Sequence, residues 1–106
     1  MPGIITVILG AIIVVMAIIN MTGNISTLHA YHRKNVTEEN RKPFGRRVGI
    51  GTLIIGVSVM LFGGAMALFE DNEAVVLVAS AVLIVGIVVG SIITFRAMHK
   101  YNGGIF

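Results

Sequence analysis

Three long apolar stretches, separated by short polar segments, dominate the pattern of this chain. Residues 4–21, 48–69 and 74–95 contain no Asp, Glu, Lys, Arg or His. A helix rises about 1.5 Å per residue, so stretches of this length cover the roughly 30 Å hydrocarbon core of a bilayer. Apolar and polar residues do not alternate, as they would in a small membrane barrel. The pattern therefore predicts three transmembrane helices, which close their backbone hydrogen bonds internally.

The first apolar stretch is expected to remain in the protein rather than be cleaved as a signal peptide. Only Met1, Pro2 and Gly3 precede it, so it lacks a basic leader region, and it is longer than the usual apolar core of a signal. The prediction is a single membrane domain over residues 1–106. Its expected parts are transmembrane helices at about 4–22, 44–69 and 73–96, a basic cytoplasmic loop at about 23–43, and a tail at 97–106.

The polar segment after the first span predicts a short helix that lies on the membrane surface. Ile25, Leu28 and Tyr31 recur every three residues, and Asn24 or Ser26 is placed to cap such a helix. Charged and histidine side chains fill its other faces, as in helices that lie in the interface. The expected fold class is therefore all-α, with three transmembrane helices and an interfacial helical loop between the first two.

The ends of the second and third spans carry recognisable helix signals. Residues 37–39, Thr-Glu-Glu, resemble a helix start, and Pro43 suits the first turn of the second span. Residues 70–73 are too few to do more than turn the chain, so the last two helices must form an antiparallel hairpin. Asp71 or Asn72 is placed to cap the third helix.

Composition and charge strengthen the membrane assignment and predict an orientation. Hydrophobic residues make up 56% of the chain and charged residues 12%, about half the usual charged share of soluble domains. Because basic loops stay in the cytoplasm, we expect a multi-pass protein of the cell membrane with its N-terminus outside and its C-terminus inside. Clustering of the net charge of +3 in one loop argues against nucleic acid as a partner. Six of the eight basic residues lie there: Arg33, Lys34, Arg41, Lys42, Arg46 and Arg47.

Small residues recur at intervals of seven within the apolar stretches. Seven residues is nearly two helical turns, so each series forms a stripe along one face, where a neighbouring backbone can approach closely. Two interpretations stay open: packing within the chain, and a face for self-association. In the first span the series is Gly3, Gly10 and Ala17. The residues predicted to pack or to interact in the other two are Gly45, Gly49, Gly56, Gly63, Gly86 and Gly90.

The spans offer little material for catalysis, cofactor binding or ion coupling. Their hydroxyl groups lack an ionisable partner in any span, so we expect them to bond a backbone carbonyl or a neighbouring helix, and we expect neither an enzyme nor a cofactor. His29 and His32 are three residues apart but have no third histidine or cysteine nearby, so no metal site is predicted. The absence of charge within the spans also argues against a proton- or sodium-coupled transporter.

Two interpretations of the basic loop stay open. It is a topology signal that also contacts anionic lipid, at about 1 kcal/mol for each suitably placed residue, or it is a docking surface for a cytoplasmic or membrane partner. The expected partners are therefore the lipid bilayer, anionic lipid at this loop, and either a second copy of the chain or another membrane protein.

Residues 31–49, YHRKNVTEENRKPFGRRVG, place a basic and acidic segment before a glycine-bearing helix and after a first span. This layout, with Ile54, Ile55 and Gly56 following, resembles small bacterial membrane proteins of the sporulation-delay immunity type and related uncharacterised three-helix families. Residues 32–34, His-Arg-Lys, stand where the immunity family has an arginine-threonine-proline motif. The resemblance implies a helical protein that protects against, senses or binds a membrane-active peptide.

Together these patterns favour a small integral membrane protein that acts by helix–helix interaction, as an immunity or regulatory protein. In this hypothesis Gly49, Gly56 and Gly63 admit a partner helix, while basic residues such as Arg41 and Arg46 fix its depth. The alternative is transport, by a homo-oligomeric channel for small solutes or by an accessory subunit of a transporter.

Overall fold

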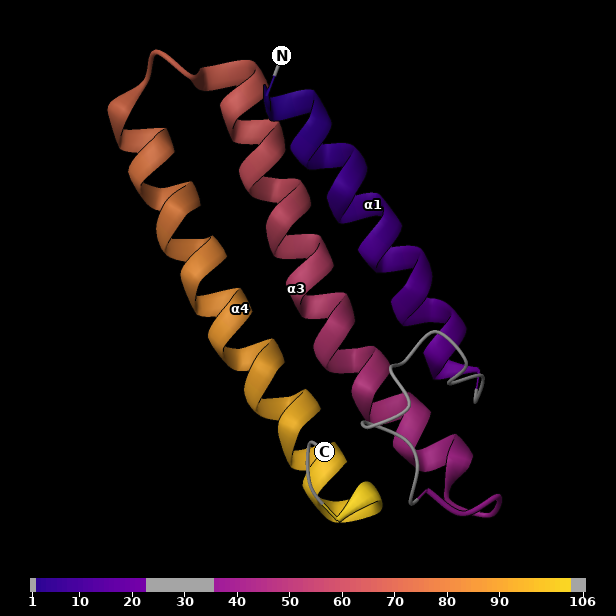
Figure 1. Cartoon of the computed structure of the whole chain (residues 1–106). Helices are drawn as coiled ribbons and strands as arrows, with labels where there is room; N and C mark the ends of the chain where they lie inside the picture. The colour runs from indigo at the N-terminus through magenta and orange to yellow at the C-terminus, as the bar shows by residue number, and fades with distance from the viewer. Residues whose placement is uncertain (1, 23–35, 104–106) are drawn as a thin grey trace.

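The computed structural model describes residues 2–22 and 36–103, which contain three long helices and no strand. The helices are α1 (Pro2–Met21), α3 (Arg41–Phe69) and α4 (Glu73–Asn102). Each runs antiparallel to its neighbour, and the three lie side by side (Figure 1). The all-α prediction is confirmed, as is the prediction of three helices that are each long and apolar enough to cross a membrane.

Helix α3 is the middle member of the row. It packs along its length against α1 on one side and α4 on the other, whereas the described parts of α1 and α4 make no contact with each other. The three helices therefore form a layer rather than a closed triangle (Figure 1). As a result α3 buries two faces, while α1 and α4 bury one face each.

The contact between α1 and α3 brings backbone against backbone. A Cβ atom on Gly63 would lie 2.7 Å from the Val7 nitrogen and 2.9 Å from the Gly3 carbonyl oxygen. A Cβ atom on Gly10 would lie 2.9 Å from the Gly56 carbonyl oxygen. Real Cβ atoms do not approach other atoms so closely, so this interface exists only because both helices carry glycine there.

The contact between α3 and α4 uses a second set of small residues. A Cβ atom on Gly90 would lie 2.5 Å from the Gly51 carbonyl oxygen, and one on Gly51 would lie 2.6 Å from the Gly90 carbonyl oxygen. Further along, Gly86 packs directly against the Ser58 side chain. Helix α3 therefore carries two glycine-bearing faces, one for each neighbour.

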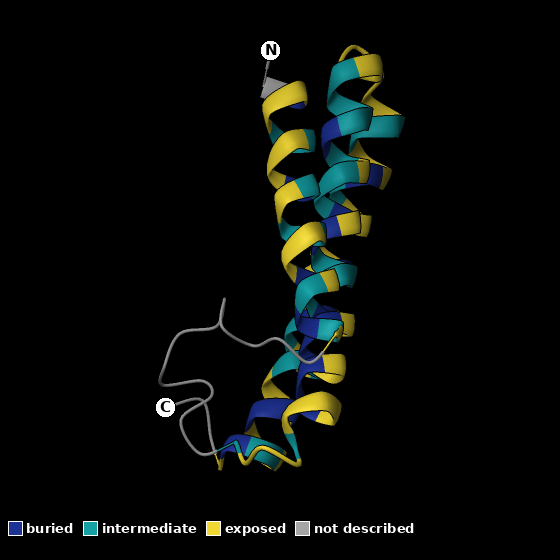
Figure 2. Cartoon of the chain, turned by 90° about the vertical axis from the view of Figure 1, so that its right-hand side faces the viewer, coloured by how far each residue is buried: buried dark blue, intermediate teal, exposed yellow. Residues whose placement is uncertain are grey.

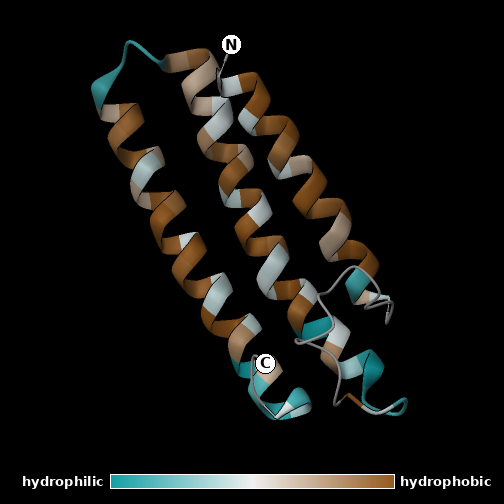
Figure 3. Cartoon of the chain, viewed as in Figure 1, coloured by the Kyte–Doolittle hydropathy of each residue, from teal (hydrophilic) through white to brown (hydrophobic). Residues whose placement is uncertain are grey.

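Large apolar side chains cover the outside of the layer. They are exposed along the outer faces of α1 and α4 (Figures 2 and 3). Contact of so many apolar side chains with water would be unfavourable, whereas contact with lipid would not. On α1 they include Ile4, Ile8, Leu9, Ile12 and Val15, and on α4 they include Leu77, Val78, Ile84, Val85, Val88 and Ile92. The exposed surface thus agrees with a protein whose helices are surrounded by hydrocarbon.

Two helix ends differ from the predicted boundaries. Helix α3 begins at Arg41 instead of residue 44, and Thr37 starts a turn rather than a helix, with the Asn40 N–H donating to its carbonyl oxygen at 3.1 Å. Helix α4 continues to Asn102, six residues beyond the expected end. Gly103, at φ 76°, ends it by donating its N–H to the Met98 carbonyl oxygen. Glycine adopts this left-handed conformation without strain.

The other end signals agree with the structure. Pro43 lies in the first turn of α3. Asn72 is the residue that caps α4, since its side chain accepts a hydrogen bond from the Val75 N–H at 3.2 Å. The predicted interfacial helix through Ile25, Leu28 and Tyr31 lies outside the described residues.

The glycine contacts predict different effects of substitution at the neighbouring residues Gly63 and Gly64. Gly63→Ala should lower the free energy of unfolding by about 1–3 kcal/mol, because its methyl group would press on the α1 backbone and force the helices apart. Gly64→Ala is the control, since a Cβ atom there meets nothing within 4 Å among the described residues outside its own helix backbone. Steric trapping in lipid bicelles measures both values. Equal effects at the two neighbouring positions would contradict the packing described.

Candidate functional site

One end of the layer gathers the basic side chains. The start of α3 and the end of α4 lie together there, while the acidic turn of residues 70–73 lies at the other end (Figure 3). Among the described residues, the cations of this end are Arg41, Lys42, Arg46, Arg47, Arg96 and Lys100. We call this part of the molecule the basic end.

A small apolar core holds the basic end together. Phe44 and Val48 of α3 are fully buried against Ala97 and Met98 of α4, which are 1% and 5% exposed. Tyr101 packs against the same cluster from the last turns of α4. This core explains why α4 continues as a helix beyond its apolar stretch: its final turns complete the packing around Phe44.

The Tyr101 ring lies at the centre of the aromatic and cationic contacts. It meets the Phe44 ring edge to face, with the centroids 6.1 Å apart and the planes at 72°. The guanidinium carbon of Arg47 lies 5.6 Å from the Tyr101 centroid, and the ammonium nitrogen of Lys100 lies 5.3 Å from it. These distances are within the range of cation–π attraction, so the ring helps to hold two positive charges in place.

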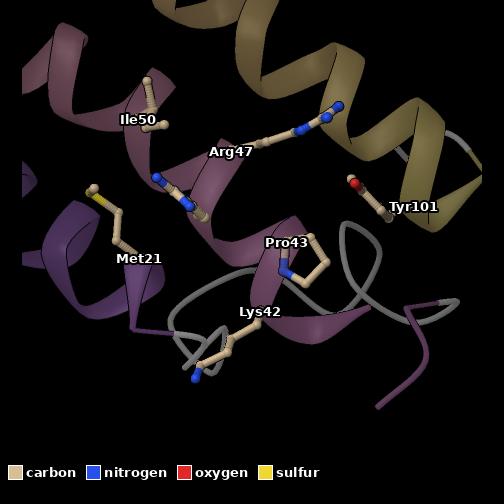
Figure 4. Close-up of a pocket in the computed structure, with 7 residues that line it drawn as sticks. Met21, Lys42, Pro43, Arg47, Ile50 and Tyr101 are labelled. Carbon is tan, nitrogen blue, oxygen red and sulfur yellow. The ribbon is translucent and has the colours of Figure 1, made fainter. Parts of the chain in front are cut away.

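A crevice opens at the basic end, lined by side chains from all three helices (Figure 4). Its volume is about 850 Å³, and it receives side chains from the end of α1, the first turns of α3 and the last turn of α4. Three of the lining residues are cations, three are apolar and one is the tyrosine: Lys42, Arg46, Arg47, Met21, Pro43, Ile50 and Tyr101. We call it the three-cation crevice.

A second hollow is lined by Arg47 of α3 and by residues near the end of α4. It has a volume of about 790 Å³ and also combines cations with apolar groups. Its lining is Arg47, Ile92, Ile93, Phe95, Arg96, Ala97, His99 and Lys100. Arg47 therefore lines two hollows of similar chemistry.

Most cations of the basic end have no acidic partner among the described residues. The ion pair found in this part of the chain joins Arg41 to Glu38 at 3.2 Å. The first turn of α3 contains no acidic residue, and the Asn40 side chain makes no capping bond. Since a helix N-terminus already carries partial positive charge, the added cations create a strongly positive region that favours anions.

The six glycines predicted to pack or interact all lie within the chain's own interfaces or buried regions. Gly49, Gly56 and Gly63 of α3 lie against α1, and Gly86 and Gly90 of α4 lie against α3. The sixth, Gly45, is buried near the start of α3. An external partner on the Gly49–Gly56–Gly63 face would first have to displace α1.

The structure also uses residues that were not singled out as site residues from the sequence. Gly51 and Ser58 are seven apart on the α4 side of α3, so the same seven-residue spacing could have revealed this second stripe. Tyr101 had no such signal, because its role depends on α4 extending past the apolar stretch. Of the predicted basic-loop residues, Arg33 and Lys34 lie outside the described residues, as do His29 and His32.

The hydroxyl groups of Ser58 and Ser80 in the spans bond to backbone carbonyls of their own helix. Ser58 Oγ donates to the Ile54 carbonyl oxygen at 2.7 Å, and Ser80 Oγ donates to the Val76 carbonyl oxygen at 2.8 Å. This i to i−4 pattern confirms the expected bonding of hydroxyl groups to backbone carbonyls at these two positions. No group of three or more potential metal ligands lies together within residues 2–22 and 36–103.

The fold and its surface define a small multi-pass integral membrane protein of the all-α class. Comparison of the chain with protein-family models, curated proteins and solved structures finds no match.

The contacts of Tyr101 predict a local effect on the end of α4. Tyr101→Leu removes the ring that contacts Phe44, Arg47 and Lys100, so the amides of residues 98–102 should exchange hydrogen about tenfold faster. Tyr101→Phe keeps the ring and should stay near the wild-type rate. Hydrogen–deuterium exchange in detergent micelles provides the comparison. Unchanged exchange in the leucine variant would show that the ring does not fix this end.

Proposed function

We propose that this protein acts by helix–helix association in the membrane, as a small regulatory or immunity-type protein. The observation that carries the proposal is an uncovered strip on the central helix. Because α1 and α4 do not meet, α3 keeps one apolar face open to the bilayer between them. We call this face the open strip.

The open strip combines large side chains with one gap. Ile50, Val57, Leu61 and Leu68 are all exposed, and their spacing of seven, four and seven places them on one side of α3. Gly64 lies in the same series, and a Cβ atom there would meet no atom within 4 Å in the described part of the chain beyond its own helix backbone. The other glycines of α3 whose surroundings are described contact a neighbouring helix closely.

A gap of this kind favours contact with a partner helix over contact with lipid. Hydrophobic burial contributes little within a bilayer, so association depends on close packing and on how near two backbones can come. A partner helix seated over Gly64 gains such an approach, with Leu61 and Leu68 packing beside it. The sequence-based hypothesis placed the partner on Gly56 and its neighbours, but α1 occupies that face.

The described spans support association better than transport or catalysis. They carry no ionisable side chain that would mark an ion path or an acid–base pair. Two shallow hollows lie along α4 and are lined mainly by apolar residues. Ala74, Val78 and Ala79 line one of them. The resemblance in layout to immunity-type membrane proteins points in the same direction.

The absence of cysteine from the chain makes a clean crosslinking test possible. Val57→Cys places a thiol on the open strip, and Val85→Cys places one on the outer face of α4 as the control. In native membranes oxidation should link Val57→Cys to a neighbouring helix, most simply that of a second copy. Adding Gly64→Leu should reduce this product at least fivefold, because the leucine fills the gap from a position where a Cβ atom meets no other helix among the described residues.

Two results would count against the proposal. Equal crosslinking at Val57→Cys and Val85→Cys would indicate random collision rather than a preferred face. Saturable solute flux in vesicles that contain the purified protein alone would favour the transport alternative.

A further inference from the structure

We propose that the three-cation crevice binds the phosphate of an anionic glycerophospholipid, with the acyl region of the lipid against its apolar wall. This inference does not rest on the helix association proposed above, because it is argued from the cations of the basic end, although Ile50 belongs to both the crevice and the open strip. It assigns one occupant to the crevice from the chemistry of its lining.

The three cations of the crevice come from neighbouring turns of one helix. Lys42 and Arg46 are four residues apart on α3, which places them one turn apart on the same side. Arg47 extends from α3 toward α4, where the Tyr101 ring holds its guanidinium group at 5.6 Å (Figure 4). A phosphate diester has the charge, the size and the acceptor oxygens to meet guanidinium and ammonium donors together.

Two observations indicate that these charges need an anion. First, Arg41 is paired with Glu38, whereas within the described residues Lys42, Arg46 and Arg47 have no carboxylate partner. Second, the three cations crowd the start of a helix that has no acidic residue in its first turn and no side-chain cap. Like charges beside a positive helix end repel one another and the helix dipole, so a bound anion would remove an unfavourable interaction.

The apolar part of the lining selects an amphiphile rather than a free ion. Met21 is the last residue of α1, and Ile50 is an exposed member of the apolar stretch of α3. The crevice therefore extends from charged side chains into the region that hydrocarbon occupies. A lipid phosphate at the cations would place its glycerol and first acyl carbons beside these two side chains.

The size of the crevice agrees with part of a lipid. At about 850 Å³ it is large enough for a headgroup and the first part of a chain. A zwitterionic lipid offers the same phosphate but adds a cation, which Lys42 and Arg46 would repel. The expected preference is therefore for a lipid with net negative charge.

Native mass spectrometry of the delipidated full chain in detergent tests the proposal, with phosphatidylglycerol as probe and phosphatidylcholine as comparison. Wild-type protein should retain one phosphatidylglycerol molecule with at least tenfold preference. Arg46→Gln should weaken that binding about fivefold, and Lys42→Gln should do the same independently. Arg41→Gln removes an equal charge from the same helix but lies outside the crevice lining, so it should change binding less than twofold.

The remaining comparisons distinguish binding in the crevice from nonspecific attraction to positive charge. They also distinguish a lipid ligand from a soluble anion. Equal losses in Arg41→Gln and Arg46→Gln, or equal retention of the two lipids, would overturn the proposal. Inorganic phosphate at millimolar concentration should leave phosphatidylglycerol bound, and its complete displacement would show that the crevice takes a free phosphate instead. Gel filtration of each variant, with an unchanged monodisperse peak expected, verifies that the exposed substitutions leave the fold intact.

Discussion

The close approach of helix backbones through glycine is the constraint on which this structure depends. In a bilayer, moving an apolar side chain from lipid to a neighbouring helix changes its free energy little. Helix association is therefore stabilised mainly by close contacts along a long interface. Helix α3 meets this requirement twice, with Gly56 and Gly63 toward α1 and Gly51 toward α4. The row of three helices follows, because a helix with two glycine-bearing faces can hold a neighbour on each.

The same arrangement separates the molecule into regions of different chemistry. Its middle is apolar and held by backbone contacts, one end carries the acidic turn, and the other gathers cations around Phe44 and Tyr101. The row leaves α3 partly uncovered, which creates the open strip around Gly64. Both proposals therefore derive from one geometry: an open row of helices exposes its central member, and a polar helix start next to an apolar span creates an amphiphilic crevice.

Much of the fold was predictable because transmembrane length, seven-residue spacing and capping are local properties. The three spans, the Asn72 cap and the hydroxyl bonds of Ser58 and Ser80 were within reach of the sequence. What was not predictable depends on contacts between distant residues. The last turns of α4 are helical because Met98 and Tyr101 pack against Phe44. The series that contains Gly51 could be read from its seven-residue spacing, whereas no pattern indicates that Gly64 faces outward.

Glycine contacts across the helices test the central claim most directly. Protein labelled with ¹³C at its glycines and reconstituted in lipid bilayers should show, by solid-state NMR, interhelical cross-peaks between Gly10 and Gly56 and between Gly51 and Gly90. Gly64 should show none to a glycine of α1 or α4. Absence of both expected contacts in an otherwise helical, bilayer-embedded sample would contradict the account, since the layer could not then be held by backbone approach at α3.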